Sequence, residues 1–217
     1  MKSAMSIHRR LSLLISAASI FGALAAILAI LPLSIPYPPI PYLKFDLAEI
    51  PVMIALLCFG PISGIGSALI YWAILLWVGE FSPIGPSMKF LAVFSMLIGL
   101  WIGVKIFKES RLMLFLSFLL GIFLRIVSMS AMNYLIVYLL FPDFMGLAAR
   151  TISLVLGINV SGRLSCLIII LIFTAIFNLI HSILSIVPSV VIVKYISSKE
   201  LTPHFKRTWY KMILEKG

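Results

Sequence analysis

Residues 47–78 read LAEIPVMIALLCFGPISGIGSALIYWAILLWV, an almost uninterrupted apolar run that decides how the chain folds. As a single helix the run would be about 48 Å long, well beyond the roughly 30 Å hydrocarbon core of a bilayer. Gly60 and Pro61 lie near its middle, where proline cannot continue a helix that is already hydrogen-bonded. We therefore expect two membrane helices here, a short one over 47–59 and a longer one over 62–78.

Four further apolar runs flank this stretch, and each is long enough to span a membrane. The predicted fold is an all-α membrane protein, with six transmembrane helices packed in one compact bundle. The additional predicted helices are 11–31, 87–107, 112–140 and 164–195, the last of them kinked but not ended by Pro188.

Connecting and terminal segments complete this single domain, which we place over residues 1–217. The proline-rich stretch 33–42 cannot continue the first helix and is expected to form an extended outer loop with two tyrosines. Segment 141–163 is looser and has room for a short interfacial helix. Residues 196–217 form a basic, polar tail.

The composition indicates that lipid is the main solvent of the chain. Hydrophobic residues make up 62% of the sequence and charged residues 11%, against roughly 25% charged residues in a soluble domain. Lysine and arginine outnumber aspartate and glutamate by 17 to 7, but they sit at the ends of apolar runs. That placement is typical of membrane topology and of contact with anionic lipid headgroups, and it builds no basic groove for nucleic acid.

The basic residues also predict the orientation in the cell membrane, because cytoplasmic loops are enriched in lysine and arginine. If the N-terminus is cytoplasmic, the inner side carries twelve basic residues and the outer side four. Both termini are therefore expected in the cytoplasm, with the proline-rich loop outside. The inner set is Lys2, Arg9, Arg10, Lys105, Lys108, Arg111, Lys194, Lys199, Lys206, Arg207, Lys211 and Lys216, and the outer set is Lys44, Lys89, Arg150 and Arg163.

The sequence carries no recognisable catalytic or metal-binding motif. It has no G-x-S-x-G, no H-E-x-x-H and no glycine-rich phosphate loop with lysine. Cys58 and Cys166 lie in apolar segments and are interpreted as free thiols that act as small apolar side chains. We therefore predict neither an enzyme nor a cofactor or metal site. A membrane-embedded lipid enzyme is the weaker alternative, and it would depend on the acidic pair Asp46 and Glu49.

That acidic pair opens the helix predicted over 47–59. Asp46 has the position of an N-cap, and Glu49 follows three residues later, as in a capping box. The pair is therefore expected to cap the helix at the outer interface. Next to the proline and tyrosine loop, a capped helix end would also form a rigid lid and an outward-facing mouth.

A few polar side chains fall inside predicted spans, where such groups are costly and usually face a bundle interior or a cavity. Arg125, Asn133 and Tyr134 lie in the fifth predicted helix. Asn178 and His181, three positions apart and hence on one face, lie in the sixth. These groups either form interhelical hydrogen bonds or line a pocket for a polar, uncharged small molecule.

Small residues recur every four positions in the first predicted helix, at Ala18, Gly22 and Ala26. This spacing makes a flat stripe that another helix can approach closely. Two interpretations remain open, namely ordinary packing within the domain and docking of a partner membrane protein.

Several segments carry a resemblance to a known family. The most specific is YLKFDLAEIP at 42–51 followed by FGPISG at 59–64, and weaker matches are PIG at 83–85 with Phe90, MNY at 132–134 and FNLI at 177–180. Together they cover most of the chain and resemble the substrate-binding S components of energy-coupling factor (ECF) vitamin transporters. The riboflavin-specific branch is the most similar one.

The resemblance implies six helices around an outward-facing vitamin pocket that the first loop covers. It implies a transmembrane coupling subunit and two cytoplasmic ATPases as partners, with the stripe Ala18, Gly22 and Ala26 contacting the coupling subunit. The substrate-binding residues that it implies are Tyr42, Leu43, Lys44, Asp46, Lys89, Asn133, Asn178 and His181.

Four residues depart from the riboflavin branch near the expected pocket. His181 stands where that branch usually has lysine, Ala68 and Tyr71 replace its usual glutamate and lysine, and Lys89 replaces an asparagine. Riboflavin or a related flavin is the first choice, because a flat ring with a polar tail suits an apolar pocket with a few amides. Another vitamin or vitamin precursor, of the thiamine or pyrimidine type, is the alternative, and a structural membrane protein without a ligand is a third.

Overall fold

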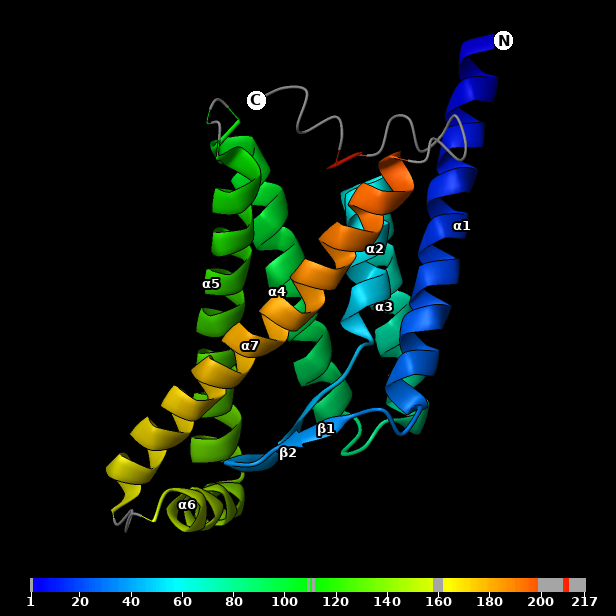
Figure 1. The fold of residues 1–217 in the computed structure, drawn as a ribbon. Coiled ribbons are helices and arrows are strands. Elements are labelled where there is room, and N and C mark those ends of the chain that lie inside the picture. The colour runs from blue at the N-terminus through cyan, green and yellow to red at the C-terminus, as the bar shows by residue number, and fades with distance from the viewer. Residues whose placement is uncertain (1, 109, 111, 158–161, 199–208, 211–217) are drawn as a thin grey trace.

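The computed structural model describes residues 2–108, 110, 112–157, 162–198 and 209–210. The chain forms a bundle of tilted helices with a small β-hairpin across one end (Figure 1). The helical elements are α1 (Lys2–Ile30), α2 (Glu49–Phe59), α3 (Pro61–Val78), α4 (Ile84–Ile106), α5 (Met113–Asn133), the π-helix η1 (Tyr134–Leu140), α6 (Pro142–Leu156) and α7 (Arg163–Ser198). The hairpin consists of β1 (Ile35–Tyr37) and β2 (Ile40–Phe45).

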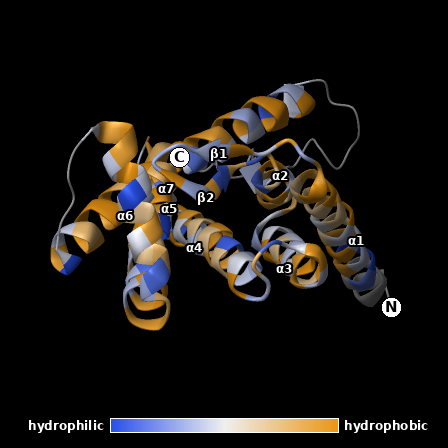
Figure 2. Ribbon diagram, turned by 90° about the horizontal axis from the view of Figure 1, so that it is seen from below, coloured by the Kyte–Doolittle hydropathy of each residue, from blue (hydrophilic) through white to orange (hydrophobic). Residues whose placement is uncertain are grey.

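Five helical segments of the described chain are long and apolar enough to cross a membrane, and α2 is a short sixth helix between them. The five are His8–Ile30, α3, α4, the continuous segment Met113–Leu140 and α7. The helices are coloured mostly hydrophobic in Figure 2, and large apolar side chains such as Ile20, Phe123 and Val191 are exposed on them. These side chains would face lipid, so the predicted helical membrane bundle is confirmed.

The helix boundaries follow the sequence signals closely. Gly60 separates α2 from α3 with a φ of 93°, a conformation that favours glycine, and Pro61 begins α3 at its first helical position. Pro188 lies inside α7, which continues to Ser198 as expected. α1 begins at Lys2, well before its apolar run, because a helix can continue through polar residues outside the hydrocarbon.

The proline-rich segment is a β-hairpin, which the expected all-α fold omits. β1 and β2 pair antiparallel, with Ile35 opposite Phe45. Tyr37 and Ile40 are buried in one apolar cluster with Phe177 of α7. The hairpin is therefore anchored to the bundle rather than free, and it positions the residues that lead from β2 into α2.

The segment between η1 and α7 contains the short helix that the sequence predicted, α6. It lies at the hairpin end and runs across the directions of the long helices (Figure 1). Ala148 and Ile152 are buried on its inner face, whereas Leu147 and Leu154 are exposed. The mixture of a covered face and exposed leucines fits the predicted interfacial position.

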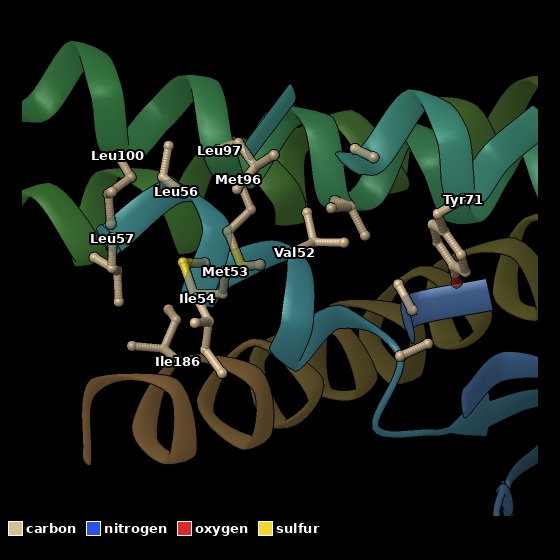
Figure 3. Packing of buried hydrophobic residues seen from close by; sticks show 14 of the residues in the cluster. Val52, Met53, Ile54, Leu56, Leu57, Tyr71, Met96, Leu97, Leu100 and Ile186 are labelled. Atoms are coloured by element: carbon tan, nitrogen blue, oxygen red, sulfur yellow. The ribbon is translucent and has the colours of Figure 1, made fainter. Parts of the chain in front are cut away.

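The larger apolar core surrounds α2, most of whose residues are buried. Side chains from α2 meet side chains from α3, α4 and α7 (Figure 3). Close packing of this kind holds helices together where lipid competes for apolar contacts. The contacting residues labelled in Figure 3 are Val52, Met53, Ile54, Leu56, Leu57, Tyr71, Met96, Leu97, Leu100 and Ile186.

The small-residue stripe of α1 packs inside the molecule. A Cβ added to Gly22 would lie 2.8 Å from Ile70 Cβ of α3, and a Cβ on Gly66 would lie 2.9 Å from Ala18 Cβ. Ala26 is also buried. The stripe therefore lies against α3 and not on a free surface. This agrees with the first interpretation, ordinary packing within the domain. Contact of the same stripe with a coupling subunit stays a prediction.

Gly22→Val is expected to destabilise the isolated protein by about 1–3 kcal/mol, because the added methyl groups overpack the α1–α3 contact. The apparent melting temperature in detergent measures this change. Ala23→Val is the matched control, since Ala23 is exposed on the same helix. Equal melting temperatures for the two variants would contradict tight packing of the stripe on α3.

The two ends of the bundle differ in what they carry (Figure 1). The start of α1, the α2–α3 junction, the α4–α5 connection and the end of α7 lie at one end. The hairpin, the α3–α4 loop (79–83) and α6 lie at the other. Lys105 and Lys108 therefore share an end with the start of α1, as the predicted alternation of spans requires. The assignment of that end to the cytoplasm stays a prediction.

Candidate ligand site

A cavity of about 600 Å³ lies beside the hairpin, within the size range of small-molecule sites. Its wall comes from the end of α1, from β2, from the start of α2 and of α6, and from α3, α4, α5, η1, α7 and the α3–α4 loop. Every residue that the resemblance implies for substrate binding lines this one cavity, although the residues come from four separate parts of the sequence. They are Tyr42, Leu43, Lys44, Asp46, Lys89, Asn133, Asn178 and His181.

Asp46 does not cap α2 as the sequence suggested. The helix begins at Glu49, and its N-cap position is Ala48, which makes no side-chain capping bond. One carboxylate oxygen of Asp46, Oδ1, instead accepts a hydrogen bond from the Ala48 backbone N–H at 2.9 Å. The other, Oδ2, forms an ion pair with Lys89 of α4. Asp46 therefore connects the end of the hairpin strand to α4 beside the cavity.

A second ion pair lies at the rim of the cavity. Lys44 Nζ of β2 contacts Glu80 Oε2 of the α3–α4 loop at 2.6 Å. Both side chains are partly open to solvent, which weakens such a pair. Lys44 and Asp46 thus attach the same strand end to two different neighbours, the α3–α4 loop and α4.

Glu49 is not part of a capping box either, and this is the larger correction. Its carboxylate is buried and accepts two hydrogen bonds from the Arg125 guanidinium, at 2.5 Å from Nη1 and 2.8 Å from Nη2. Ser185 of α7 donates a third hydrogen bond at 2.8 Å. Both ions are 1% exposed, so the pair relies on its own hydrogen bonds and not on water.

Asn178 and His181 extend this network to α7. Arg125 Nε donates to Asn178 Oδ1 at 3.0 Å, and Arg125 Nη2 lies 3.3 Å from His181 Nδ1. His181 Nε2 lies 3.2 Å from the backbone oxygen of Asp46. Nδ1 acting as acceptor and Nε2 as donor satisfies both contacts with a neutral imidazole. The two residues therefore make interhelical hydrogen bonds and also line the cavity, which joins the two interpretations left open by the sequence.

Asn133 and Tyr42 offer polar groups that the protein leaves open. Asn133 Nδ2 donates to the Met129 backbone oxygen at 2.8 Å, and no donor among the described residues pairs with its Oδ1. The Tyr42 hydroxyl is buried and has no hydrogen-bond partner among the described residues. Burial raises the pKa of Tyr42 to about 12, so the hydroxyl keeps its proton at neutral pH. A ligand could use one acceptor and one donor here.

Aromatic rings form much of the remaining wall. Phe177 of α7 stacks on Phe45 with ring centroids 4.6 Å apart, and Phe144 makes edge contacts with Phe81 and Phe141. Four of these rings, those of Phe81, Phe141, Phe144 and Phe177, line the cavity. Flat, apolar side chains of this kind favour an aromatic ligand.

The described residues contain no group of three or more histidine, cysteine, aspartate or glutamate side chains that could hold a metal ion. Neither Cys58 nor Cys166 takes part in a disulfide among the described residues. The sequence did not reveal two features of this site. Arg125 forms a buried ion pair with Glu49, and Glu80 lines the cavity and pairs with Lys44. Arg125, the single basic residue of the segment Met113–Leu140, was a signal for an acidic partner, but the sequence pattern had already explained Glu49 as part of a capping box.

The fold and the cavity define a multi-pass membrane protein with a cavity of small-molecule size beside an anchored hairpin. Comparisons with known proteins agree: the model of the family described as "ECF transporter, substrate-specific component" matches residues 14–193. The chain therefore belongs to the family of ECF transporter S components, and it is a transporter subunit and not an enzyme. S components bind a substrate and associate with an energy-coupling module.

Individual relatives support the same family. The "Riboflavin transporter RibU" of Staphylococcus aureus (strain TCH60) is 29% identical over 130 residues, which cover 60% of this chain and 68% of that protein. A solved structure of the S component of a bacterial ECF transporter has a TM-score of 0.58 and 21% identity, and the match covers 90% of this chain and 99% of that one. The second likeness shows the fold.

Proposed function

We propose that this S component captures riboflavin or a closely related flavin from the outer side of the cell membrane. We further propose that its energy-coupling module consists of a transmembrane coupling subunit and two cytoplasmic ATPases. The observation that carries the proposal is an aromatic-walled cavity of about 600 Å³ with an open amide acceptor and an open hydroxyl donor. The similarity to a riboflavin transporter points the same way.

A flavin suits this wall because its two parts need different partners. The flat ring system can pack against phenylalanine faces such as Phe177, and its imide N–H can donate to an amide oxygen such as Asn133 Oδ1. The polyol chain can exchange hydrogen bonds with polar side chains of the remaining wall, which extends from Lys44 at the rim to Asn178 beside Arg125.

The main alternative ligand, a cationic vitamin of the thiamine type, finds less support in the cavity. Such a ligand would need an unpaired carboxylate or a cluster of acceptors to replace its hydration. Each of the three carboxylates in the described wall, those of Asp46, Glu49 and Glu80, already contacts a basic side chain. A ligand without net charge fits this arrangement better.

The proposal is tested by a ligand screen on the purified protein in detergent. Riboflavin should raise the apparent melting temperature, since a ligand at 100 times its Kd stabilises the folded state by about 2.7 kcal/mol. Native mass spectrometry should show one flavin bound per chain. A shift with thiamine or another vitamin, and none with riboflavin, would replace the flavin by that ligand.

Asn133→Ala is expected to weaken riboflavin binding by about tenfold or more, because a ligand donor would lose its buried acceptor. Titration of the protein with riboflavin, followed by flavin fluorescence, measures the change. Ser128→Ala on the same helix is the matched control, since Ser128 does not line the cavity. Equal affinities for both variants would remove Asn133 from the site.

A further inference from the structure

The charged side chains around the cavity form closed pairs. Within the described part of the chain, three cations and three carboxylates line the wall, and each cation contacts one carboxylate. The formal charge of the wall is therefore zero, and no cation is left for an anionic ligand. The pairs are Lys44 with Glu80, Lys89 with Asp46, and Arg125 with Glu49.

We propose that Glu49 sets the charge selectivity of the site by occupying Arg125, so that the S component takes an uncharged flavin and rejects its phosphorylated form. This inference rests on the proposed function, since it concerns the ligand of the same cavity. It assigns Glu49 as a specificity-determining residue that acts through Arg125.

Arg125 is the group that a phosphate would otherwise use. Arginine binds phosphate oxygens with two parallel N–H donors, and it does so best where water is excluded. Here both terminal nitrogens of the guanidinium donate to the Glu49 carboxylate, at 2.5 and 2.8 Å. The remaining donors meet Asn178 Oδ1 at 3.0 Å, His181 Nδ1 at 3.3 Å and Met96 Sδ at 3.8 Å. Every nitrogen of Arg125 thus has a protein partner.

The Arg125–Glu49 pair determines the charge selectivity because it is the most deeply buried of the three pairs. The Lys44 and Glu80 side chains are 33% and 69% exposed, so solvent screens their charges. The Lys89 side chain is 26% exposed, whereas the Arg125 side chain is 2% exposed. A phosphate with roughly −1.5 to −2 charge at pH 7 would have to displace Glu49 to gain Arg125 and would leave a buried carboxylate unpaired. This penalty weakens binding of the phosphorylated flavin only, and it therefore discriminates against the phosphate in favour of riboflavin.

The experiment compares riboflavin with riboflavin 5′-phosphate on the full-length protein in detergent. Wild type should bind riboflavin at least about tenfold more tightly than the phosphate. In Glu49→Gln, Arg125 keeps its charge but loses its carboxylate partner, so the ratio of the two affinities should shift toward the phosphate by about tenfold or more. The phosphate should then also raise the melting temperature of this variant more, relative to riboflavin, than it does for wild type.

Two further variants separate charge selectivity from damage to the fold. Asp143→Asn also removes one carboxylate at the hairpin end, but Asp143 is exposed and outside the cavity wall, so the wild-type preference should persist. The double variant Glu49→Gln/Arg125→Gln removes both charges, and it should show no gain for the phosphate. A loss of folding in Glu49→Gln that the phosphate reverses would support the inference as well.

Equal binding of both flavins by wild type would overturn the inference and leave the proposed function intact. An unchanged affinity ratio in a folded Glu49→Gln protein would overturn it too, as would the same gain for the phosphate in the double variant. Failure of wild type to bind either flavin would instead overturn the proposed function, and the inference with it.

Discussion

Replacing Arg125 with methionine is expected to destabilise the protein by about 3–5 kcal/mol, the cost of leaving one member of a buried ion pair alone. At roughly 2–4 °C per kcal/mol for a chain of this size, the apparent melting temperature should fall by about 10 °C. Differential scanning fluorimetry in detergent, on the ligand-free protein, measures the fall.

The reason is the position of Glu49 in the first turn of α2, where it has no access to water. In the variant its carboxylate would keep the Ser185 hydroxyl at 2.8 Å and would lose both guanidinium donors. Asn178 Oδ1 would lose its donor as well. Because Arg125 contacts residues of α2 and α7 from its own place on α5, the loss also loosens three helices from one another.

The double variant Glu49→Met/Arg125→Met is the control that isolates the unpaired charge. Replacing a buried pair by apolar side chains of similar volume is often neutral or stabilising. The double variant should therefore melt well above Arg125→Met and near wild type. A melting temperature of Arg125→Met equal to that of wild type would mean that Glu49 finds another counter-charge. The hydrogen bonds described between Glu49 and Arg125 would then not stabilise the fold.

The helices could be predicted from the sequence because hydropathy and helix breakers are local signals. The split at Gly60 and Pro61, the passage of α7 through Pro188 and the short helix in 141–163 all depend on residues a few positions apart. The cavity residues came from the family resemblance. The wall contains all eight of them, and their part in binding a ligand stays a prediction.

The features that were missed depend on residues far apart in the chain. Glu49 and Arg125 are 76 positions apart, and His181 and Asp46 are 135 apart. The motif around Asp46 and Glu49 matched a capping box, and this local explanation hid the distant partners Lys89 and Arg125. The hairpin was missed for a similar reason, since its pairing is stabilised by burial of Tyr37 and Ile40 against α7.

Asp46→Asn is expected to weaken riboflavin binding by about 100-fold, mainly through faster dissociation. The amide can still accept the hydrogen bond from the Ala48 backbone N–H, so the local turn should persist. What disappears is the ion pair with Lys89, which joins the end of β2 to α4. Without it the hairpin is held beside the cavity mainly by the exposed Lys44–Glu80 pair and by its apolar contacts.

Stopped-flow fluorescence of the released flavin measures the dissociation rate, and the association rate should change little because it is limited by entry of the ligand and not by the ion pair.

The double variant Asp46→Asn/Lys89→Met distinguishes two possible causes of the weaker binding. If the uncompensated lysine charge causes the loss, the double variant should recover affinity; if the tie between β2 and α4 causes it, the double variant should release the flavin as fast as Asp46→Asn. We expect the second result, because His181 still bonds to the Asp46 backbone and keeps the strand end near α7, so α4 is the neighbour from which the hairpin separates. A dissociation rate of Asp46→Asn within twofold of wild type would show that the hairpin does not depend on this pair to stay closed.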